Sequence, residues 1–507
     1  MKNRFSLATL ALFAALAGPV LAQEDDAALW SRLQAQAKAY SPSFAESGPF
    51  DSAEWTTNDG YPLLGDPNAK KGGRLLGSME EPLPTFRTDG PESNLTVLSR
   101  MHDLVYERLL GLHPTTLEFI PGLATHWQFD YDAQMLRFRL NPKARWSDGS
   151  EVTSDDVVAS WEHSAGVHHK GDGTEDASWS RKDPYSEQLY GLSYERPVAE
   201  DKYTVAVKMK EVNWRLPIYF GVSMKIFPAK YIRVSGEDYL KGYQWRFVMG
   251  SGPYQMLPED HEEQQSYALS RRIDYWGKDE RFSIGLYNFD KIKYVVVGDD
   301  TIEFEKFKKG EVDYYFNTKA QRWAEEYDFD KVQNGWIQRR KVYTKEPQGF
   351  GGLVFNMRVP PFDDLRVRKA FCYLFNRERL MEKLFYRQYD FVDSYEPGTV
   401  YANENNQKIR YNPELATELL ADAGWKTRNK DGWLVNDEGK IFEVTLELGS
   451  PTLERIFTVV QDDFQKAGIT SHPLEDGSLS AFRVIPITLT TLTDNALQGM
   501  GLSRTQV

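Results

Sequence analysis

Hydrophobic and polar residues alternate in several stretches of the chain, and this alternation predicts β-strands. The clearest stretch is 136–140, where leucine, phenylalanine and leucine are separated by two arginines. Residues 202–209 and 442–448 show the same period of two, and 292–297 is a short, mostly apolar run. Because a period of two places alternate side chains on opposite faces, these segments are expected to be partly buried strands.

Other stretches have hydrophobic residues every three or four positions, which predicts helices. A second indication comes from residues that suit helix ends. Thr153 with Asp156 predicts a capping box, and Asn412 followed by Pro413 predicts a helix that ends at Gly424. The clearest apolar stripe consists of Val367, Ala370, Phe371, Leu374 and Phe375.

Strand and helix patterns alternate in the second half of the chain. The strand at 292–297 precedes an expected helix at 300–309, which Gly310 can terminate, and a second strand is expected at 312–316. A helix at 453–464 likewise follows the strand at 442–448. This alternation predicts an α/β fold built in layers.

Composition places the chain among water-soluble globular proteins. Hydrophobic residues make up 41% of its 507 residues and charged residues 27%, which excludes a disordered chain and a multi-span membrane protein. The formal net charge is −13. Because binding to phosphate backbones requires a positive surface, we expect no nucleic-acid partner. At about 150 residues per domain, the length corresponds to about three domains.

The first 22 residues have the pattern of a secretory signal peptide. Lys2 and Arg4 precede an apolar stretch at 5–16, and small residues lead up to Ala22. An uncleaved membrane anchor is the alternative, but the apolar stretch is short and polar residues follow at once. We expect cleavage after Ala22, a periplasmic location, and an N-terminal leader at 23–66.

Cys372 is the only cysteine, so the chain has no intrachain disulfide. Because Cys372 lies within a helical apolar pattern, we expect a small buried hydrophobic side chain. The predicted cleavage point also lacks a cysteine that could receive a lipid, which favours a freely diffusing protein.

Residues 478–507 differ in composition from the rest of the chain. They contain only three charged residues and a Thr-Leu repeat at 488–493. We expect an anomalous tail that arises from a shifted reading frame or a truncation. A genuine polar tail is the alternative.

None of the sequence motifs typical of catalytic, metal or cofactor sites is complete. The Gly-Ser-Gly segment at 250–252 lacks the spacing of a phosphate-binding loop, and His261 lacks the second histidine of a zinc motif. His168 and His169 are the best metal candidates, but they lie in the polar stretch 163–184, which we expect to be a surface loop. We therefore expect no catalytic residue, no metal and no cofactor.

Paired acids and an aromatic stretch have ordinary structural explanations. The acid pairs precede or open expected helices, where negative charge is favourable, so we expect helix caps. The aromatic stretch 243–247 contains Trp245 and Phe247, and it is expected either to line a ligand cleft or to pack in a core. The acid pairs are Asp155-Asp156, Asp299-Asp300 and Asp363-Asp364.

Seven short motifs occur in a fixed order along the chain. They are PNAKKGGRL at 67–75, YERLL at 106–110, PGLATHW at 121–127, ARWSDGSEVTSDDVV at 144–158, GSGPY at 250–254, KGEVD at 309–313 and PPFDDLRVRKA at 360–370. In this order they resemble the family 5 extracellular solute-binding proteins, the periplasmic receptors of peptide-type ABC importers. The likeness covers about residues 67–475 and is greatest to the microcin C and oligopeptide branch.

The resemblance implies a two-lobed periplasmic binding protein of type II that closes over its ligand. Lobe I would span 67–295, with an inserted subdomain at about 91–194, and lobe II would span 296–477. Because the tail at 478–507 replaces the late part of lobe II, we expect that lobe to be incomplete. For the same reason we assign no acidic residue to the amino terminus of the ligand.

The resemblance also implies that strand edges near the lobe junction bind the main chain of a peptide. The expected partners are an oligopeptide or peptide-like ligand and the membrane permease of an ABC transporter, with the protein acting as a monomer. Binding proteins for sugars or opines share the fold and remain an alternative, as does a periplasmic hydrolase. The candidate binding residues are Ser78, Met79, Glu80, Trp245, Phe247, Phe350, Gly351 and Asn356.

Overall fold

The computed structural model of the chain describes most residues from Asp26 onward. The described ranges are 26–46, 48–169, 175–317, 319–342, 351–394, 397, 402–446, 454–473 and 483–488. The predicted signal peptide at 1–22 lies outside them. Among these residues, none of the helices has the length and apolar character needed to cross a membrane.

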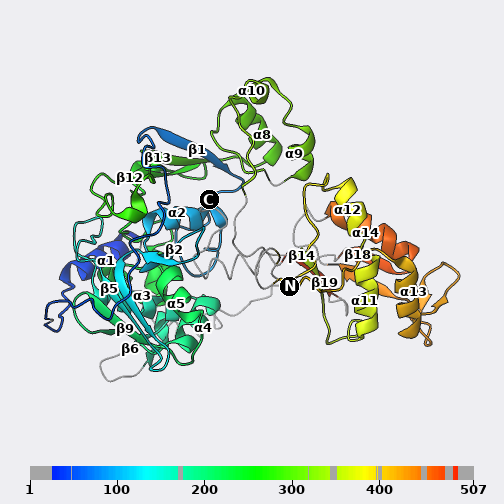
Figure 1. The fold of residues 1–507 in the computed structure, drawn as a ribbon, viewed down its shortest axis with the longest axis horizontal. Coiled ribbons are helices and arrows are strands. Elements are labelled where there is room, and N and C mark those ends of the chain that lie inside the picture. The colour runs from blue at the N-terminus through cyan, green and yellow to red at the C-terminus, as the bar shows by residue number, and fades with distance from the viewer. Residues whose placement is uncertain are drawn as a thin grey trace, which may run out of the picture.

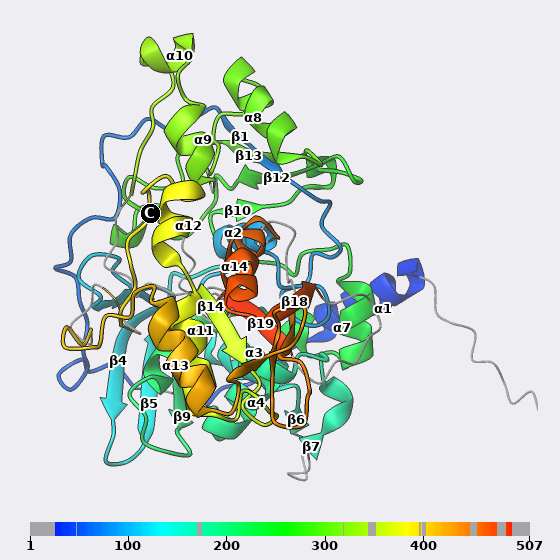
Figure 2. The same ribbon diagram turned by 90° about the vertical axis from the view of Figure 1, so that its right-hand side faces the viewer.

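The described chain forms two lobes (Figure 1). The larger lobe contains the first half of the sequence, and the smaller one contains the helices α11 to α14. Three further helices, α8 (Asp300–Lys309), α9 (Ala320–Glu325) and α10 (Asp330–Gln333), lie at the top of both ribbon views (Figures 1 and 2). This two-lobed α/β arrangement confirms the expected fold class.

A five-stranded mixed sheet forms one part of the larger lobe. Its order is β1 (Arg74–Met79), β13 (Lys291–Val296), β12 (Ser266–Arg271) and β10 (Tyr254–Gln255), and β11 (His261–Glu262) also pairs with β12. Residues more than 200 positions apart meet in the parallel pair β1–β13, where Ser78 lies opposite Val295. The strand β1 is therefore at the edge of the sheet.

A second, antiparallel sheet forms the other part of the larger lobe. Its order is β4 (Ala124–Asp130), β5 (Met135–Leu140), β9 (Thr204–Lys208) and β8 (Val198–Ala199). The core beside it includes residues from Leu109 to Ile226, so it extends past position 194. The helices α3 (Ser154–Ala165) and α4 (Pro184–Ser193) lie next to each other in this part.

The expected caps and strands are confirmed in the larger lobe. The capping box of Thr153 and Asp156 begins α3, and β5 and β9 coincide with the alternating stretches. The leader begins with α1 (Asp26–Ala39), which buries Leu29 and Leu33. An ion pair of 2.8 Å joins Arg32 of α1 to Asp238.

The remaining short elements of the larger lobe connect these parts. They are α2 (Thr96–Val105), α5 (Leu216–Ile218), α6 (Ala229–Ile232), α7 (Gly236–Gly242), the hairpin β2 (Leu110–Leu112) with β3 (Phe119–Pro121), the pair β6 (His168–His169) with β7 (Glu175–Asp176), the 3-10 turns η1 (Ala177–Trp179), η3 (Pro258–Asp260) and η4 (Arg281–Ser283), and the π-helical turn η2 (Tyr219–Ser223).

The smaller lobe packs helices against a four-stranded sheet. The sheet order is β14 (Gly351–Phe355), β19 (Arg483–Thr488), β17 (Glu443–Leu446) and β18 (Thr470–Pro473), with the two-residue strands β15 (Thr427–Arg428) and β16 (Leu434–Val435) in a separate pair. The helices are α11 (Leu365–Leu374), α12 (Arg377–Lys383), α13 (Pro413–Asp422) and α14 (Glu454–Lys466). The expected caps Asp364 and Asn412 are confirmed at the starts of α11 and α13.

The tail contributes one strand, β19, which lies between β14 and β17. The other residues of 478–507 lie outside the described ranges. The expected incompleteness of lobe II, like the other domain limits, stays a prediction.

Three expectations from the sequence are wrong. Residues 312–316 do not form a strand. Cys372 is exposed, because the buried stripe of α11 consists of Val367, Ala370, Phe371 and Leu374 and position 372 points away from it. The stretch 163–184 is not wholly a surface loop, because His163 and Arg181 at its ends are each 1% exposed.

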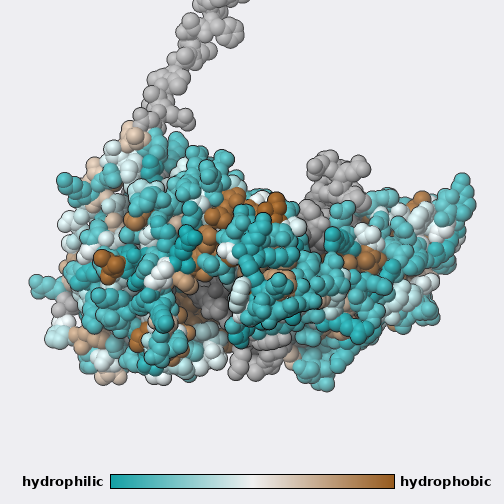
Figure 3. Space-filling model, turned by 90° about the horizontal axis from the view of Figure 1, so that it is seen from above, coloured by the Kyte–Doolittle hydropathy of each residue, from teal (hydrophilic) through white to brown (hydrophobic). Residues whose placement is uncertain are grey.

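Hydrophilic residues cover most of the surface seen from above, and hydrophobic residues form only small, scattered patches on it (Figure 3). This surface agrees with the high proportion of charged residues in the sequence.

Candidate ligand-binding site

The end of β1 presents unpaired main-chain groups at the edge of its sheet. The amide of Val297 donates to the carbonyl of Met79 (2.8 Å), so the main chain of Met79 faces β13. The main chain of Leu76 faces the other way, because its carbonyl accepts from the amide of Asp313 (2.7 Å). Since direction alternates along a strand, the main chain of Ser78 also faces away from β13. Among the described residues, no backbone group bonds Ser78 on that side.

Asp313 explains why the expected strand at 312–316 is absent. Its amide donates to the Leu76 carbonyl, and its Oδ2 accepts from the Leu76 amide at 2.9 Å. A carboxylate oxygen thus takes the place of the backbone carbonyl that a neighbouring strand would supply. Pairing with β1 therefore stops at Leu76, and no described backbone group pairs with the edge beyond it.

The three predicted residues at the end of β1 differ in their surroundings. Ser78 is half-buried, and its Oγ donates to Oε1 of Glu303 on α8 at 2.5 Å. Burial raises the pKa of Glu303, and the Ser78 hydrogen bond opposes that shift. Met79 is buried in the core, so only its main chain can contribute, whereas Glu80 is exposed.

A cavity of about 540 Å³ lies elsewhere in the larger lobe. It is bounded by the loop 88–94, by α2, by the start of α4 and by residues 223–227. The helices α2 and α4 lie on the side of this lobe that faces the smaller lobe (Figures 1 and 2). Its volume falls within the usual range for pockets that hold small molecules, about 300–1,000 Å³.

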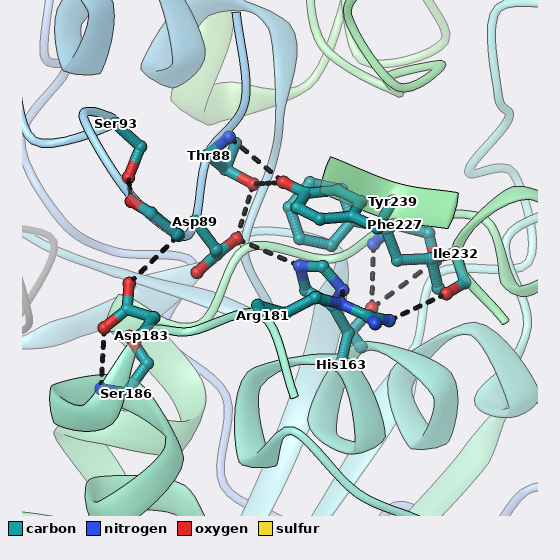
Figure 4. A network of polar contacts seen from close by, with 12 residues as sticks. Thr88, Asp89, Ser93, His163, Arg181, Asp183, Ser186, Phe227, Ile232 and Tyr239 are labelled. Atoms are coloured by element: carbon teal, nitrogen blue, oxygen red, sulfur yellow. Dashed lines mark hydrogen bonds and ion pairs between the residues drawn. The ribbon is translucent and has the colours of Figure 1, made fainter. Parts of the chain in front are cut away.

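A buried arginine, a buried histidine and a half-buried aspartate form a chain of hydrogen bonds behind this cavity (Figure 4). Arg181 Nε donates to His163 Nδ1 at 2.8 Å. Because Nδ1 accepts this bond, it carries no proton. The proton of the neutral ring is therefore on Nε2, which lies 3.0 Å from Asp89 Oδ2 and donates to it. Burial, together with the charge of Arg181, lowers the pKa of His163. The ring is thus neutral and holds Asp89 in place.

The same loop is tied to α4 and α7. Asp183 caps α4 by accepting from the amide of Ser186 (3.2 Å), and its other oxygen accepts from the amide of Gly90 (3.4 Å). Tyr239 of α7 contacts Thr88 through their hydroxyl groups at 3.0 Å (Figure 4). These contacts hold the loop 88–94 in place as a wall of the cavity, and the side chains that make them are buried or half-buried.

A second half-buried acid, Glu107, lies just after α2. It accepts hydrogen bonds from the hydroxyl of Tyr275 (2.6 Å) and from the indole Nε1 of Trp276 (2.8 Å). Burial raises the pKa of Glu107 to about 7, against its ordinary value of 4.5, although these hydrogen bonds favour the charged form. Glu107 therefore titrates near neutral pH.

The aromatic candidates pack against the core. Phe247 is half-buried, with its ring centroid 5.4 Å from Phe86 and 5.5 Å from His102. Trp245 is 49% exposed and meets Phe86 edge to face. Neither lines the cavity. Of the two expected roles, the structure favours core packing for Phe247.

The candidates in the smaller lobe are less well defined. Phe350 lies outside the described residues. Gly351 begins β14, which lies at the inner edge of the smaller lobe in Figure 1, and Asn356 is exposed just after that strand. The Asn356 side chain accepts from the amide of Arg358 at 3.2 Å, which holds a turn.

Sequence patterns missed Arg181, His163, Asp89 and the cavity they border. The Asp-Pro pair at 183–184 does indicate the start of α4, and that was the available signal. Three or more potential metal ligands do not come together anywhere among the described residues. His168 instead stacks on Trp179, with ring centroids 4.1 Å apart.

Comparison with known proteins gives one family. Residues 118–474 match the family described as bacterial extracellular solute-binding proteins, family 5 middle. Two curated relatives are an uncharacterised protein of Sinorhizobium fredii, y4wM, and a probable peptide-binding protein of Agrobacterium fabrum, YejA. The first is 28% identical over 448 residues, covering 80% of this chain and 64% of its own. The second is 29% identical over 380 residues, covering 73% and 58%.

A solved structure with the same fold is the oligopeptide-binding protein AppA from Bacillus subtilis in complex with a nonapeptide. The TM-score is 0.61 with 21% sequence identity, and the match covers 84% of this chain and 77% of that chain. The chain spans about two thirds, or less, of the length of the curated relatives named above.

Proposed function

Because the chain belongs to the bacterial extracellular solute-binding proteins of family 5, we propose that it captures oligopeptides or peptide-like solutes for import. The capture involves no chemical step. The two lobes close over the solute, hold it by hydrogen bonds to main-chain groups, and release it unaltered.

The free edge of β1 is the observation that supports this proposal. An extended peptide can add to an exposed sheet edge by main-chain hydrogen bonds, which are independent of its side chains. The amide and carbonyl of Ser78 face that edge. Asp313 bonds only the amide and carbonyl of Leu76, two residues earlier in the strand. Such an edge suits a receptor that accepts peptides of varied sequence.

The partners and location follow from the same proposal. A closed complex docks on the membrane permease of an ABC transporter, which uses ATP hydrolysis to drive import. The protein acts as a monomer in the periplasm, which it reaches with a cleavable signal peptide at 1–22. The names of relatives support a peptide solute, since the Agrobacterium protein is described as a probable peptide-binding protein.

Isothermal titration calorimetry with a mixed library of short peptides tests the proposal. The expected result is a saturable heat of binding. A flat titration, obtained with protein whose circular dichroism and melting curve show an intact fold, would count against a peptide solute.

A further inference from the structure

Lys225 lines the cavity of the larger lobe and is only partly exposed. Within the described part of the chain, its ammonium group makes no hydrogen bond and no ion pair. Burial lowers the pKa of Lys225, and the nearby guanidinium of Arg108 lowers it further. A partly buried cation without a partner is costly to hold, so a group that pairs with it gains more than it would at the open surface.

The acids around Lys225 are already engaged by other donors. Asp103 forms an ion pair with Arg108 at 2.5 Å. Asp89 accepts from His163 and from the Thr88 hydroxyl, and Asp183 accepts from two backbone amides. Among the described residues, none of these acids is therefore a partner of Lys225 in this arrangement.

The rest of the lining suits a compact solute group that carries a negative charge. The walls include hydroxyl groups, which can donate to an anion, and apolar side chains, which can cover the attached carbon atoms. The second lysine of the lining, Lys182, is exposed, so water can solvate its ammonium group. The hydroxyl and apolar residues are Ser93, Ser99, Ser223, Leu189, Tyr190 and Met224.

We propose that Lys225 binds a carboxylate of the captured solute and that this cavity seats the carboxylate-bearing end. The proposal rests on solute capture as the proposed function. The carboxylate belongs either to the C-terminus of a peptide or to an acidic sugar, and both supply the same group, a carboxylate on a compact polar residue.

Calorimetry with matched probes separates these sources. The probes are tri-alanine and its C-terminal amide, and glucuronate and glucose. We expect the carboxylate member of one pair to bind the wild-type protein about tenfold or more tightly than its neutral partner, as a charge-assisted hydrogen bond predicts. Lys225→Met should reduce that preference to less than about twofold.

Two further variants make the result specific. Lys225→Arg keeps the charge and should retain the preference for the carboxylate. Lys278→Met removes an exposed lysine of the same lobe, away from the cavity, and should bind like the wild type. Lys225→Met should melt at the same or a higher temperature than the wild type, because it removes an unpaired charge and keeps the volume of the side chain.

The outcomes test the role of Lys225 separately from the proposed capture of peptides. Equal binding of acid and neutral probes, or a preference that survives in Lys225→Met, overturns the role of Lys225 and leaves solute capture standing. Absence of binding by both tri-alanine and glucuronate also overturns it. Failure of the whole peptide library to bind instead contradicts the proposed peptide solute.

Discussion

Arg181 is a buried charge, and each of its three guanidinium nitrogens donates a hydrogen bond. Besides the bond to His163, its Nη1 donates to the carbonyl of Trp179 (2.6 Å) and its Nη2 to that of Val234 (3.1 Å). The guanidinium also lies over the ring of Tyr239, 5.0 Å from its centroid. The Arg181 side chain therefore links α3, η1 and α7 behind the cavity.

Arg181→Met should lower the free energy of unfolding by about 3–5 kcal/mol, since it leaves buried carbonyls and Nδ1 of His163 without their donors. Urea denaturation followed by circular dichroism measures this loss. Arg215→Met is the control, because Arg215 is exposed beside Trp214 and its removal should cost less than about 0.5 kcal/mol. A loss below about 1 kcal/mol for Arg181→Met would mean that the buried network contributes little.

Glu107 should make stability depend on pH. Its pKa is about 7 in the folded protein and 4.5 ordinarily, so the folded state binds more protons between these values. The contribution of Glu107 to the free energy of unfolding is complete below pH 4.5 and is lost as pH rises through 7. The loss from this one group is at most about 3 kcal/mol.

Glu107→Gln should remove this part of the pH dependence. Unfolding free energies measured from pH 4.5 to pH 8 should fall with pH more steeply in the wild type than in the variant. The comparison isolates Glu107, because Asp156, whose pKa burial raises to about 6, is present in both proteins. Parallel curves would show that Glu107 ionises near its ordinary pKa.

At the scale of elements, β1 combines a structural strand with a free edge. The register with β13 places Ser78 one residue before the end of the pair, and Asp313 ends the pairing on the other side at Leu76. The proposed binding of a peptide at the edge of β1 therefore depends on the main chain of Ser78 and not on its hydroxyl group.

Ser78→Pro should weaken peptide binding by about tenfold, because it removes an amide that faces the ligand edge and bonds nothing in the sheet. Ser78→Ala keeps the amide and loses only the hydrogen bond to Glu303, so it should bind within about threefold of the wild type. Calorimetry on both variants, with melting curves to verify folding, makes the comparison. Equal binding by the proline variant would exclude this edge as the peptide site.

Most elements could be predicted from the sequence because local signals fix them. The caps at Asn412 and Asp364 and the alternation in β5 and β9 are all present in the structure. The strand expected at 312–316 is absent because the carboxylate of Asp313 bonds the Leu76 amide in place of a backbone carbonyl. A pattern of hydrophobic and polar residues does not reveal such a contact. The cavity was missed because its walls come from segments far apart in the chain.

At the scale of the whole molecule, the order of short motifs identified the family, whereas single motifs had structural roles. Gly250 and Gly252 show why. A Cβ atom added at Gly250 would lie 2.1 Å from the carbonyl oxygen of Val105, and a Cβ atom added at Gly252 would lie 2.6 Å from the carbonyl oxygen of Leu104. The Gly-Ser-Gly segment thus permits close contact with α2.

Binding and release without conversion is the central claim, and mass spectrometry of recovered peptides tests it most directly. Purified protein is incubated with a defined peptide library, separated from unbound peptides by gel filtration, and denatured to release what it holds. The expected result is peptides of unchanged mass, recovered in an amount that does not decline with incubation time. Accumulation of products with altered mass, or the recovery of no peptide from folded protein, would contradict it.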